Sequence, residues 1–65
     1  MSEAGNIIVI RTVSGMAIAV AAAIDSIGFD YVVGCVAGDD TIFCAIKNEN
    51  KVTYVMECFN KLIKG

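Results

Sequence analysis

The sequence predicts an α+β domain in which two helices cover one face of a small antiparallel sheet. The chain has 65 residues, the size of a single domain. Apolar runs typical of strands and stretches of helical periodicity follow one another in the order strand, helix, strand, strand, helix (β-α-β-β-α). The two consecutive strands are so close in sequence that they must pair antiparallel, because a parallel return needs a crossover connection.

The first strand is expected over residues 6–13, where the run from Ile7 to Ile10 is β-branched. Apolar residues on both of its faces favour an inner strand that is covered on both sides. Residues 1–5 are polar and contain glycine. They are interpreted as a disordered lead or a cloning scar, so the domain is expected to span residues 6–65.

A helix is expected to begin near Gly15, with Ser14 as its N-cap, and to end at Gly28 as a left-handed terminator. The stripe predicted to face the sheet consists of Met16, Val20, Ala23, Ile24 and Ile27. A second stripe consists of Ile18, Ala21, Ala22 and Asp25, where a surface helix normally carries more charge. Because a helix that is apolar all round is buried all round, this second stripe is predicted to be a subunit interface.

The second half of the chain predicts a hairpin followed by an ordinary amphipathic helix. Strands are expected over residues 30–37 and 41–47, with a turn at 38–40, and a helix over residues 51–64. Its apolar stripe is Val52, Val55, Met56, Phe59, Leu62 and Ile63. Right-handed crossovers place both helices on one face of the sheet. The arrangement is similar to a ferredoxin-like fold without its final strand, and it leaves the other sheet face bare in a monomer.

The composition points to assembly rather than to a membrane or to nucleic acid. Hydrophobic residues make up 57% of the chain, more than one small core can bury. The longest stretch without charge, residues 12–24, is shorter than the roughly 20 residues of a spanning helix. With five basic residues and a net charge of −2, the chain has no basic patch for DNA. Contact between copies of the chain is therefore the favoured explanation.

Three cysteines, Cys35, Cys44 and Cys58, occur without a histidine or a C-x-x-C pair. A zinc site normally has four such ligands, so no metal or other cofactor is expected. The thiols are interpreted as small buried hydrophobes in a reducing cytoplasm. A tight hairpin would place Cys35 opposite Cys44, although a disulfide is unusual in that compartment. No nucleophile with an activating base is recognisable, so the chain is not expected to be an enzyme.

Asp39 and Asp40 are adjacent acids at the predicted turn. In one interpretation they are only a polar turn, because aspartate is common there. In the other they form a cation receptor, since a guanidinium relieves carboxylate repulsion and donates two hydrogen bonds to a carboxylate. Calcium competes poorly as the ligand. It takes about six to eight oxygens, and the other acids nearby in sequence are Asp30 and Glu49.

The segment from Val33 to Phe43, VGCVAGDDTIF, closely resembles the GTIAGDDTI signature of bacterial arginine repressors. Residues 8–15 resemble the strand and turn of that family, and residues 23–28 resemble the end of its helix. The resemblance extends from about residue 6 over nearly the whole chain, and its AGDDTI core is specific. It implies a C-terminal effector-binding and oligomerisation domain that forms homo-trimers and, from paired trimers, homo-hexamers with L-arginine between them.

The resemblance also implies roles for individual residues. Asp39 and Asp40 would hold the cationic groups of L-arginine as co-repressor, and Asp25 would lie near the site. The full predicted ligand site is Asp39, Asp40, Asp25, Ile18, Ala37 and Gly38. Three positions depart from the family pattern: Ile18 replaces a frequent glutamine, which puts its contact with the ligand in doubt, Ser14 replaces a proline, and Cys35 replaces a threonine.

The expected function is therefore that of an arginine-dependent transcriptional regulator of arginine metabolism. Operator DNA would be contacted through an N-terminal winged-helix domain that this chain lacks, as it lacks the edge strand expected before Asn6. Two other interpretations remain open. One is a purely structural trimerisation module, motivated by the missing glutamine at Ile18. The other is an amino-acid-binding regulatory domain of a metabolic enzyme, because such domains share this order of elements.

Overall fold

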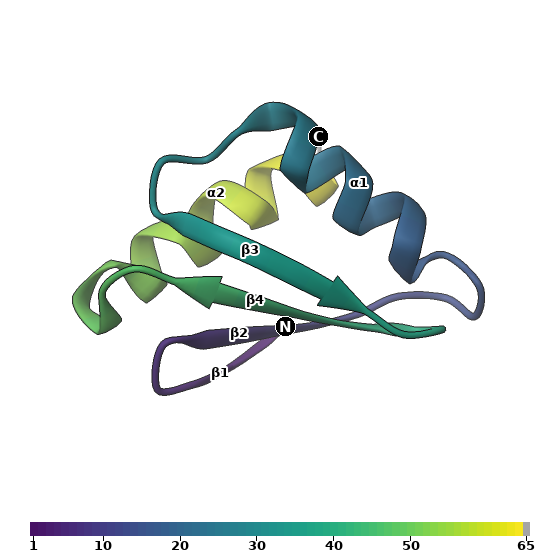
Figure 1. Ribbon diagram of the computed structural model, residues 1–65, viewed down its shortest axis with the longest axis horizontal. Coiled ribbons are helices and arrows are strands. Elements are labelled where there is room, and N and C mark those ends of the chain that lie inside the picture. Colours follow the sequence, from purple (N-terminus) through teal and green to yellow (C-terminus); the bar gives the residue numbers. More distant parts are fainter. Residues whose placement is uncertain (65) are drawn as a thin grey trace.

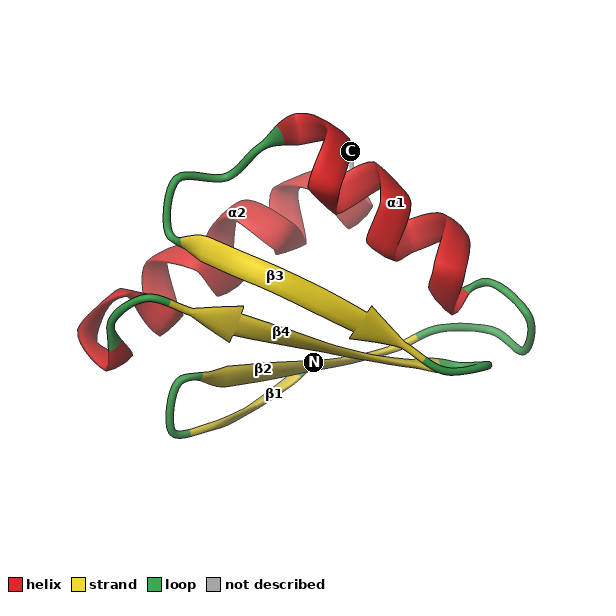
Figure 2. Cartoon of the chain, viewed as in Figure 1, coloured by secondary structure: helices red, strands yellow, loops and turns green. Residues whose placement is uncertain are grey.

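A computed structural model describes the backbone of residues 1–64 and the side chains of residues 1–62. Both long helices lie on the same face of a single sheet (Figures 1 and 2). The predicted α+β class and the predicted order of elements are confirmed, with one additional strand at the start. The elements are β1 (Ser2–Ala4), β2 (Ile7–Arg11), α1 (Ala17–Ile27), β3 (Val32–Ala37), β4 (Thr41–Ile46), the 3-10 turn η1 (Glu49–Lys51) and α2 (Val52–Lys64).

The sheet has the strand order β1-β2-β4-β3, and every neighbouring pair is antiparallel. β4 lies between β2 and β3, so β2 and β3 run in the same direction and are joined through α1. β2 and β4 are the inner strands. β3 is an edge strand, and this position matters for the cysteine that it carries.

The expectation that residues 1–5 are disordered is wrong. Ser2 to Ala4 pair with β2, with Ser2 opposite Val9 and Ala4 opposite Ile7. Gly5 has a φ of 60°, which a glycine adopts without strain, and it closes the tight turn into β2. All three residues of β1 are exposed, so backbone pairing holds the strand and no apolar pattern revealed it. This short strand covers the free edge of β2 and supplies the edge strand that was expected to be missing.

The core lies between the sheet and the two helices. Phe59 on α2 is its largest buried side chain, and its ring meets that of Phe29 edge-on at 5.1 Å between centroids. The predicted stripe of α2 is confirmed at Val52, Val55 and Phe59, whereas Leu62 is 42% exposed. The side chain of Ile63 lies outside the described residues. The buried core consists of Ile8, Ile10, Ala17, Ala21, Ile24, Ile42, Cys44, Ile46, Val52, Val55 and Phe59.

The face that α1 turns to the sheet differs from the prediction. Ala17, Ala21 and Ile24 are buried, whereas the predicted core residues Met16, Ala23 and Ile27 are exposed. Apolar residues lie on every side of α1, whose only charged residue is Asp25, so hydrophobicity alone did not fix its orientation. Small alanine side chains allow the helix to lie close to the sheet. Ala21 therefore belongs to the core and not to the outer face. Ile18, Ala22 and Asp25 are exposed as predicted.

The C-terminal end of α1 agrees with the prediction, and its N-terminal end does not. Gly28 terminates the helix in the left-handed conformation, with φ 72° and ψ 56°, as predicted. The predicted N-cap is wrong. Met16 occupies the N-cap position and makes no side-chain capping hydrogen bond, and the helix begins at Ala17.

The sheet face opposite the helices is apolar and open, as predicted for a monomer. Val9, Phe43 and Val36 lie opposite one another across three neighbouring strands. Val36 is 75% exposed and Phe43 is 54% exposed.

Within the described part of the chain, none of the helices has the length and apolar character needed to cross a bilayer.

Candidate functional site

The two adjacent aspartates lie at the tip of the β3–β4 hairpin, which confirms the predicted turn. Gly38 N–H donates to the Thr41 carbonyl oxygen at 2.8 Å and closes the hairpin just below them. The tip lies at the same end of the molecule as the start of α1 (Figure 1). We call residues Gly38 to Thr41 the aspartate turn.

Backbone hydrogen bonds fix the aspartate turn to the loop between β2 and α1. The Asp39 carbonyl oxygen accepts from the N–H of Gly15 at 3.1 Å and of Ala17 at 3.3 Å. The Asp40 carbonyl oxygen accepts from Thr12 N–H at 2.7 Å. The turn thereby satisfies an N–H group of the first turn of α1 that would otherwise need a capping side chain. The aspartates are thus held by the fold of the whole domain.

Each carboxylate also receives a side-chain donor. The Ser14 hydroxyl donates to Asp39 Oδ2 at 2.8 Å, so Ser14 contacts the acid pair instead of capping α1. Thr41 Oγ1 donates to Asp40 Oδ1 at 2.9 Å. Arg11 Nη2 donates to Asp40 Oδ2 at 3.3 Å and forms a salt bridge with it.

The hydrogen bond from Thr41, helped by the nearby charge of Arg11, lowers the pKa of Asp40 below its ordinary value. Asp40 is therefore ionised at neutral pH. The Arg11 side chain is 71% exposed, so the Arg11–Asp40 pair is solvated and contributes little to stability. Such a pair exchanges easily with another cation.

Three other residues of the predicted ligand site lie near the aspartate turn or at the same end of the fold. Gly38 belongs to the turn itself, and Ala37 precedes it as the half-buried last residue of β3. Ile18 is in the first turn of α1 and is 70% exposed. Beside the turn lies an open hollow of about 300 Å³, lined by Val36, Ala37, Gly38, Thr41 and Phe43.

Asp25 is the member of the predicted site that a single chain does not bring to the aspartate turn. It lies eight residues after Ala17 on α1, which corresponds to roughly 12 Å along the helix axis. Its negative charge acts instead on Cys35 and Cys44, and it contributes to the raised pKa of both thiols.

Within the described residues no group of three or more acidic, histidine or cysteine side chains is placed to hold a metal ion.

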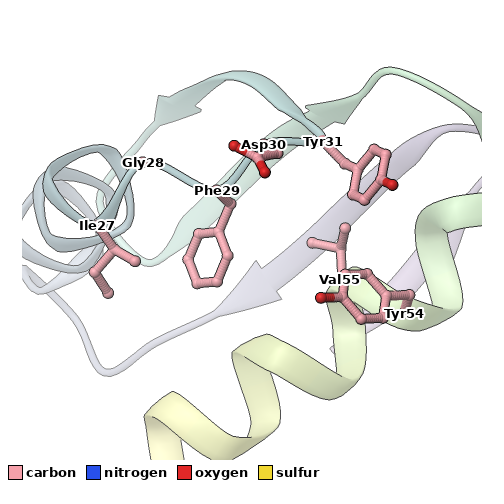
Figure 3. Close-up of a pocket in the computed structure, with 7 residues that line it drawn as sticks. All are labelled: Ile27, Gly28, Phe29, Asp30, Tyr31, Tyr54 and Val55. Carbon is pink, nitrogen blue, oxygen red and sulfur yellow. The ribbon is translucent and has the colours of Figure 1, made fainter.

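A second hollow lies beside the C-terminal end of α1 (Figure 3). It measures about 230 Å³ and contains one acid, Asp30. The rings of Tyr31 and Tyr54 meet edge-on at 5.9 Å, and Lys51 Nζ lies 5.2 Å from the centre of the Tyr31 ring. The hollow is lined by Ile27, Gly28, Phe29, Asp30, Tyr31, Tyr54 and Val55. It offers one carboxylate where the aspartate turn offers two, and it contains none of the predicted site residues.

Sequence reasoning missed two contributors to the site, Arg11 and Ser14. Arg11 ends β2 opposite Thr41, so the strand register places its side chain near the aspartate turn. A prediction of that register would have found it. Ser14 had been assigned to the helix cap, since its residue type suits both roles.

Comparisons with known proteins bear on the identity of this site. The family described as "Arginine repressor, C-terminal domain" matches residues 1–61. The arginine repressor of Lachnoclostridium phytofermentans is 55% identical over 65 residues, which is 100% of this chain and 43% of that protein. That of Lachnospira eligens is 52% identical over the same shares. That of Alkaliphilus oremlandii is 54% identical over 94% of this chain and 41% of its own length.

The chain thus spans less than half the length of these relatives. They are named as repressors and not as enzymes, in agreement with the expectation from sequence. The matched residues include all four strands, the whole of α1, the aspartate turn and α2 as far as residue 61. This chain belongs to the family of arginine repressor C-terminal domains.

Proposed function

We propose that this chain is the effector-sensing module of an arginine-dependent regulator of arginine metabolism, and that it binds L-arginine through Asp39 and Asp40. One observation carries the proposal. Two adjacent carboxylates are held at a solvent-accessible turn by backbone hydrogen bonds from a different part of the chain. A cation that meets them finds the acids already oriented, so less ordering is needed on binding.

The contact between Arg11 and Asp40 supports a guanidinium as the ligand group. Asp40 already accepts a hydrogen bond from a guanidinium of its own chain, at 3.3 Å through one oxygen. A free L-arginine can offer its planar guanidinium for a two-point contact, which is stronger than a single contact. In this proposal L-arginine replaces Arg11 on Asp40, and the ligand's charge is neutralised by the aspartate pair.

Assembly is the second part of the proposal. The apolar face of the sheet and the exposed residues Ile18 and Ala22 of α1 are the surfaces for contact between copies. We propose homo-trimers that pair into a homo-hexamer, with L-arginine between the trimers and Asp25 contributed near the site. A ligand bound at such an interface stabilises the assembly by mass action.

Control of transcription would follow from this linkage. Operator DNA would be bound by a separate part of the whole regulator, and L-arginine would fix the arrangement of those parts. Because linkage between binding sites is reciprocal, operator DNA should tighten the binding of L-arginine to the whole regulator. Repression of arginine synthesis in the presence of arginine is the expected outcome.

Calorimetry and analytical ultracentrifugation with L-arginine test both parts of the proposal. The wild-type chain should release or take up heat with L-arginine and shift to a heavier species. Asp40→Asn should bind at least about tenfold more weakly, since it loses a charge-assisted contact worth about 1.5–3 kcal/mol. Asp30→Asn is the matched control, because Asp30 is an exposed acid outside the aspartate turn, and it should bind as the wild type does.

Two results would contradict the proposal. If the wild type gives no heat with L-arginine, the aspartate turn is not an arginine site. If it binds L-arginine without any change in mass, sensing and assembly are not linked. A chain that assembles but never binds L-arginine would support the alternative, a purely structural trimerisation module, which the exposed apolar side chain of Ile18 also favours.

A further inference from the structure

The hairpin that carries the aspartate turn also carries two cysteines in direct opposition. Cys35 on β3 pairs with Cys44 on β4 in the strand register. Their Sγ atoms lie 2.7 Å apart, and both residues are free thiols. The sequence had suggested that these residues face each other, and the register confirms it.

The pairing type at this position suits a disulfide. Gly38 and Thr41 form a hydrogen-bonded pair at the end of the hairpin. Hydrogen-bonded and non-hydrogen-bonded pairs alternate along an antiparallel ladder, so Cys35 and Cys44, three pairs away, form a non-hydrogen-bonded pair. Opposite Cα atoms in such pairs are about 4.5 Å apart, inside the range of about 4.4–6.8 Å that disulfides span. A bond between the two sulfur atoms therefore needs no change of register.

The two thiols differ in access. Cys44 is fully buried on an inner strand, whereas Cys35 is half-buried on the edge strand β3. Burial is the main cause of a raised pKa for both thiols, and the rise is large for Cys44. Because the thiolate is the attacking species, the closed hairpin reacts slowly. Opening of the edge strand exposes Cys35 first.

We propose that Cys35 and Cys44 are a reversible redox pair, which a low-molecular-weight disulfide oxidises to an intrachain disulfide. The Cys35 thiolate attacks the small disulfide, forms a mixed disulfide and releases one small thiol. Cys44, after losing its proton, then attacks Cys35 Sγ and releases the second small thiol. The protein loses two protons and two electrons, and the small disulfide takes them up and is reduced to two thiols.

The bond would close a loop that contains the aspartate turn. Asp39 and Asp40 lie between the two cysteines in sequence, and the edge strand β3 would be tied to the inner strand β4. Oxidation should therefore suppress opening of β3 and leave the carboxylates on a stiffer hairpin. This inference does not depend on arginine binding, because it rests only on the register and burial of the thiols.

Thiol alkylation read by mass spectrometry tests the proposal on the wild-type chain. The protein is equilibrated in glutathione buffers from reduced to oxidised, quenched in acid, and alkylated after unfolding. Oxidation should protect Cys35 and Cys44 together and yield their cross-linked peptide, while Cys58 remains open to alkylation. Amide exchange in β3 should slow by at least about tenfold, since a disulfide that closes a short loop strongly limits opening.

Two variants provide controls. Cys58→Ser keeps the pair and should behave as the wild type, whereas Cys35→Ser should show neither the cross-linked peptide nor the slower exchange. If Cys35→Ser fails to fold, the wild type and Cys58→Ser still decide the question. The proposal is overturned if both thiols stay open to alkylation in fully oxidised buffer. It is also overturned if Cys35 stops at the mixed disulfide, or if the bonds that form join Cys58 of separate chains.

Discussion

The two helices pack on the same sheet face, yet they bury their surfaces in different ways. α2 has an apolar stripe, including Val55 and Phe59, and a polar outer side, so it serves the core of one chain. α1 buries Ala17, Ala21 and Ile24 and still exposes two isoleucines and three alanines. A surface helix that exposes this much apolar area has a second surface to cover. The difference assigns stability chiefly to α2 and leaves the outer side of α1 as a surface that we propose for contact between copies.

The largest expected effect is on α2. Phe59→Ala should cost about 3–5 kcal/mol of unfolding free energy, because it removes the largest buried side chain and leaves a cavity. Urea unfolding followed by circular dichroism measures this loss, which takes a large share of the stability of a domain this small. Leu62→Ala, on the same helix but 42% exposed, is the control and should cost far less. Equal losses for the two variants would contradict the packing described for α2.

A pair of substitutions on α1 separates its two faces. Ala21→Leu should destabilise the fold by about 1–3 kcal/mol, since it overfills the space between helix and sheet. Ala22→Leu adds the same atoms to the exposed side and should leave the unfolding free energy nearly unchanged. Thermal unfolding at low protein concentration compares the two. If Ala22→Leu lowers the thermal stability more than Ala21→Leu does, the buried and exposed faces of α1 have been exchanged.

A smaller effect on stability, but a clear effect on assembly, is expected at Ile18. Ile18→Ser changes an exposed side chain, so the unfolding free energy should move by less than about 0.5 kcal/mol. Because we propose that this residue lies between copies, the same variant should dissociate at higher protein concentration than the wild type. Sedimentation equilibrium measures that shift. Unchanged association would remove α1 from the proposed interface.

The smallest expected effect is electrostatic and concerns the aspartate turn. The pKa of Asp40 is lowered by the Thr41 hydrogen bond and by Arg11, so Arg11→Gln should raise it toward its ordinary value. A lowered pKa means that the stabilising contribution is present above the unfolded pKa of about 4 and is lost as the pH falls through the folded pKa. Carboxyl NMR titration of wild type and variant gives the two pKa values. Identical values would show that the Arg11–Asp40 contact does not persist in solution.

Much of the fold followed from sequence because its signals are local. Gly28 ends α1, the β-branched run forms β2, and the Gly38–Asp40 turn joins two strands that cannot pair in any other way. β1 escaped prediction because its residues are exposed and polar or small, and its pairing depends on the free edge of β2. The orientation of α1 escaped prediction because apolar residues lie on all of its sides, so the shape of the core decides which side faces the sheet.

The candidate site was predictable in part for a related reason. Asp39 and Asp40 are adjacent in sequence, and their turn was recognisable from the flanking strands. Arg11 and Ser14 come from a segment more than twenty residues away, and only the strand register and the loop before α1 bring them to the turn. We propose that Asp25 reaches the site from a neighbouring copy, which a single sequence does not position.

A crystal structure grown with saturating L-arginine is the strongest test of whether the aspartate turn binds this ligand. We expect the ligand's guanidinium or amino group within hydrogen-bonding distance of both Asp39 and Asp40, with Arg11 displaced from Asp40. The claim would be contradicted by a ligand bound elsewhere, for instance in the hollow beside Tyr31 and Tyr54. It would be contradicted equally by an aspartate turn that keeps its contact with Arg11 and holds no ligand.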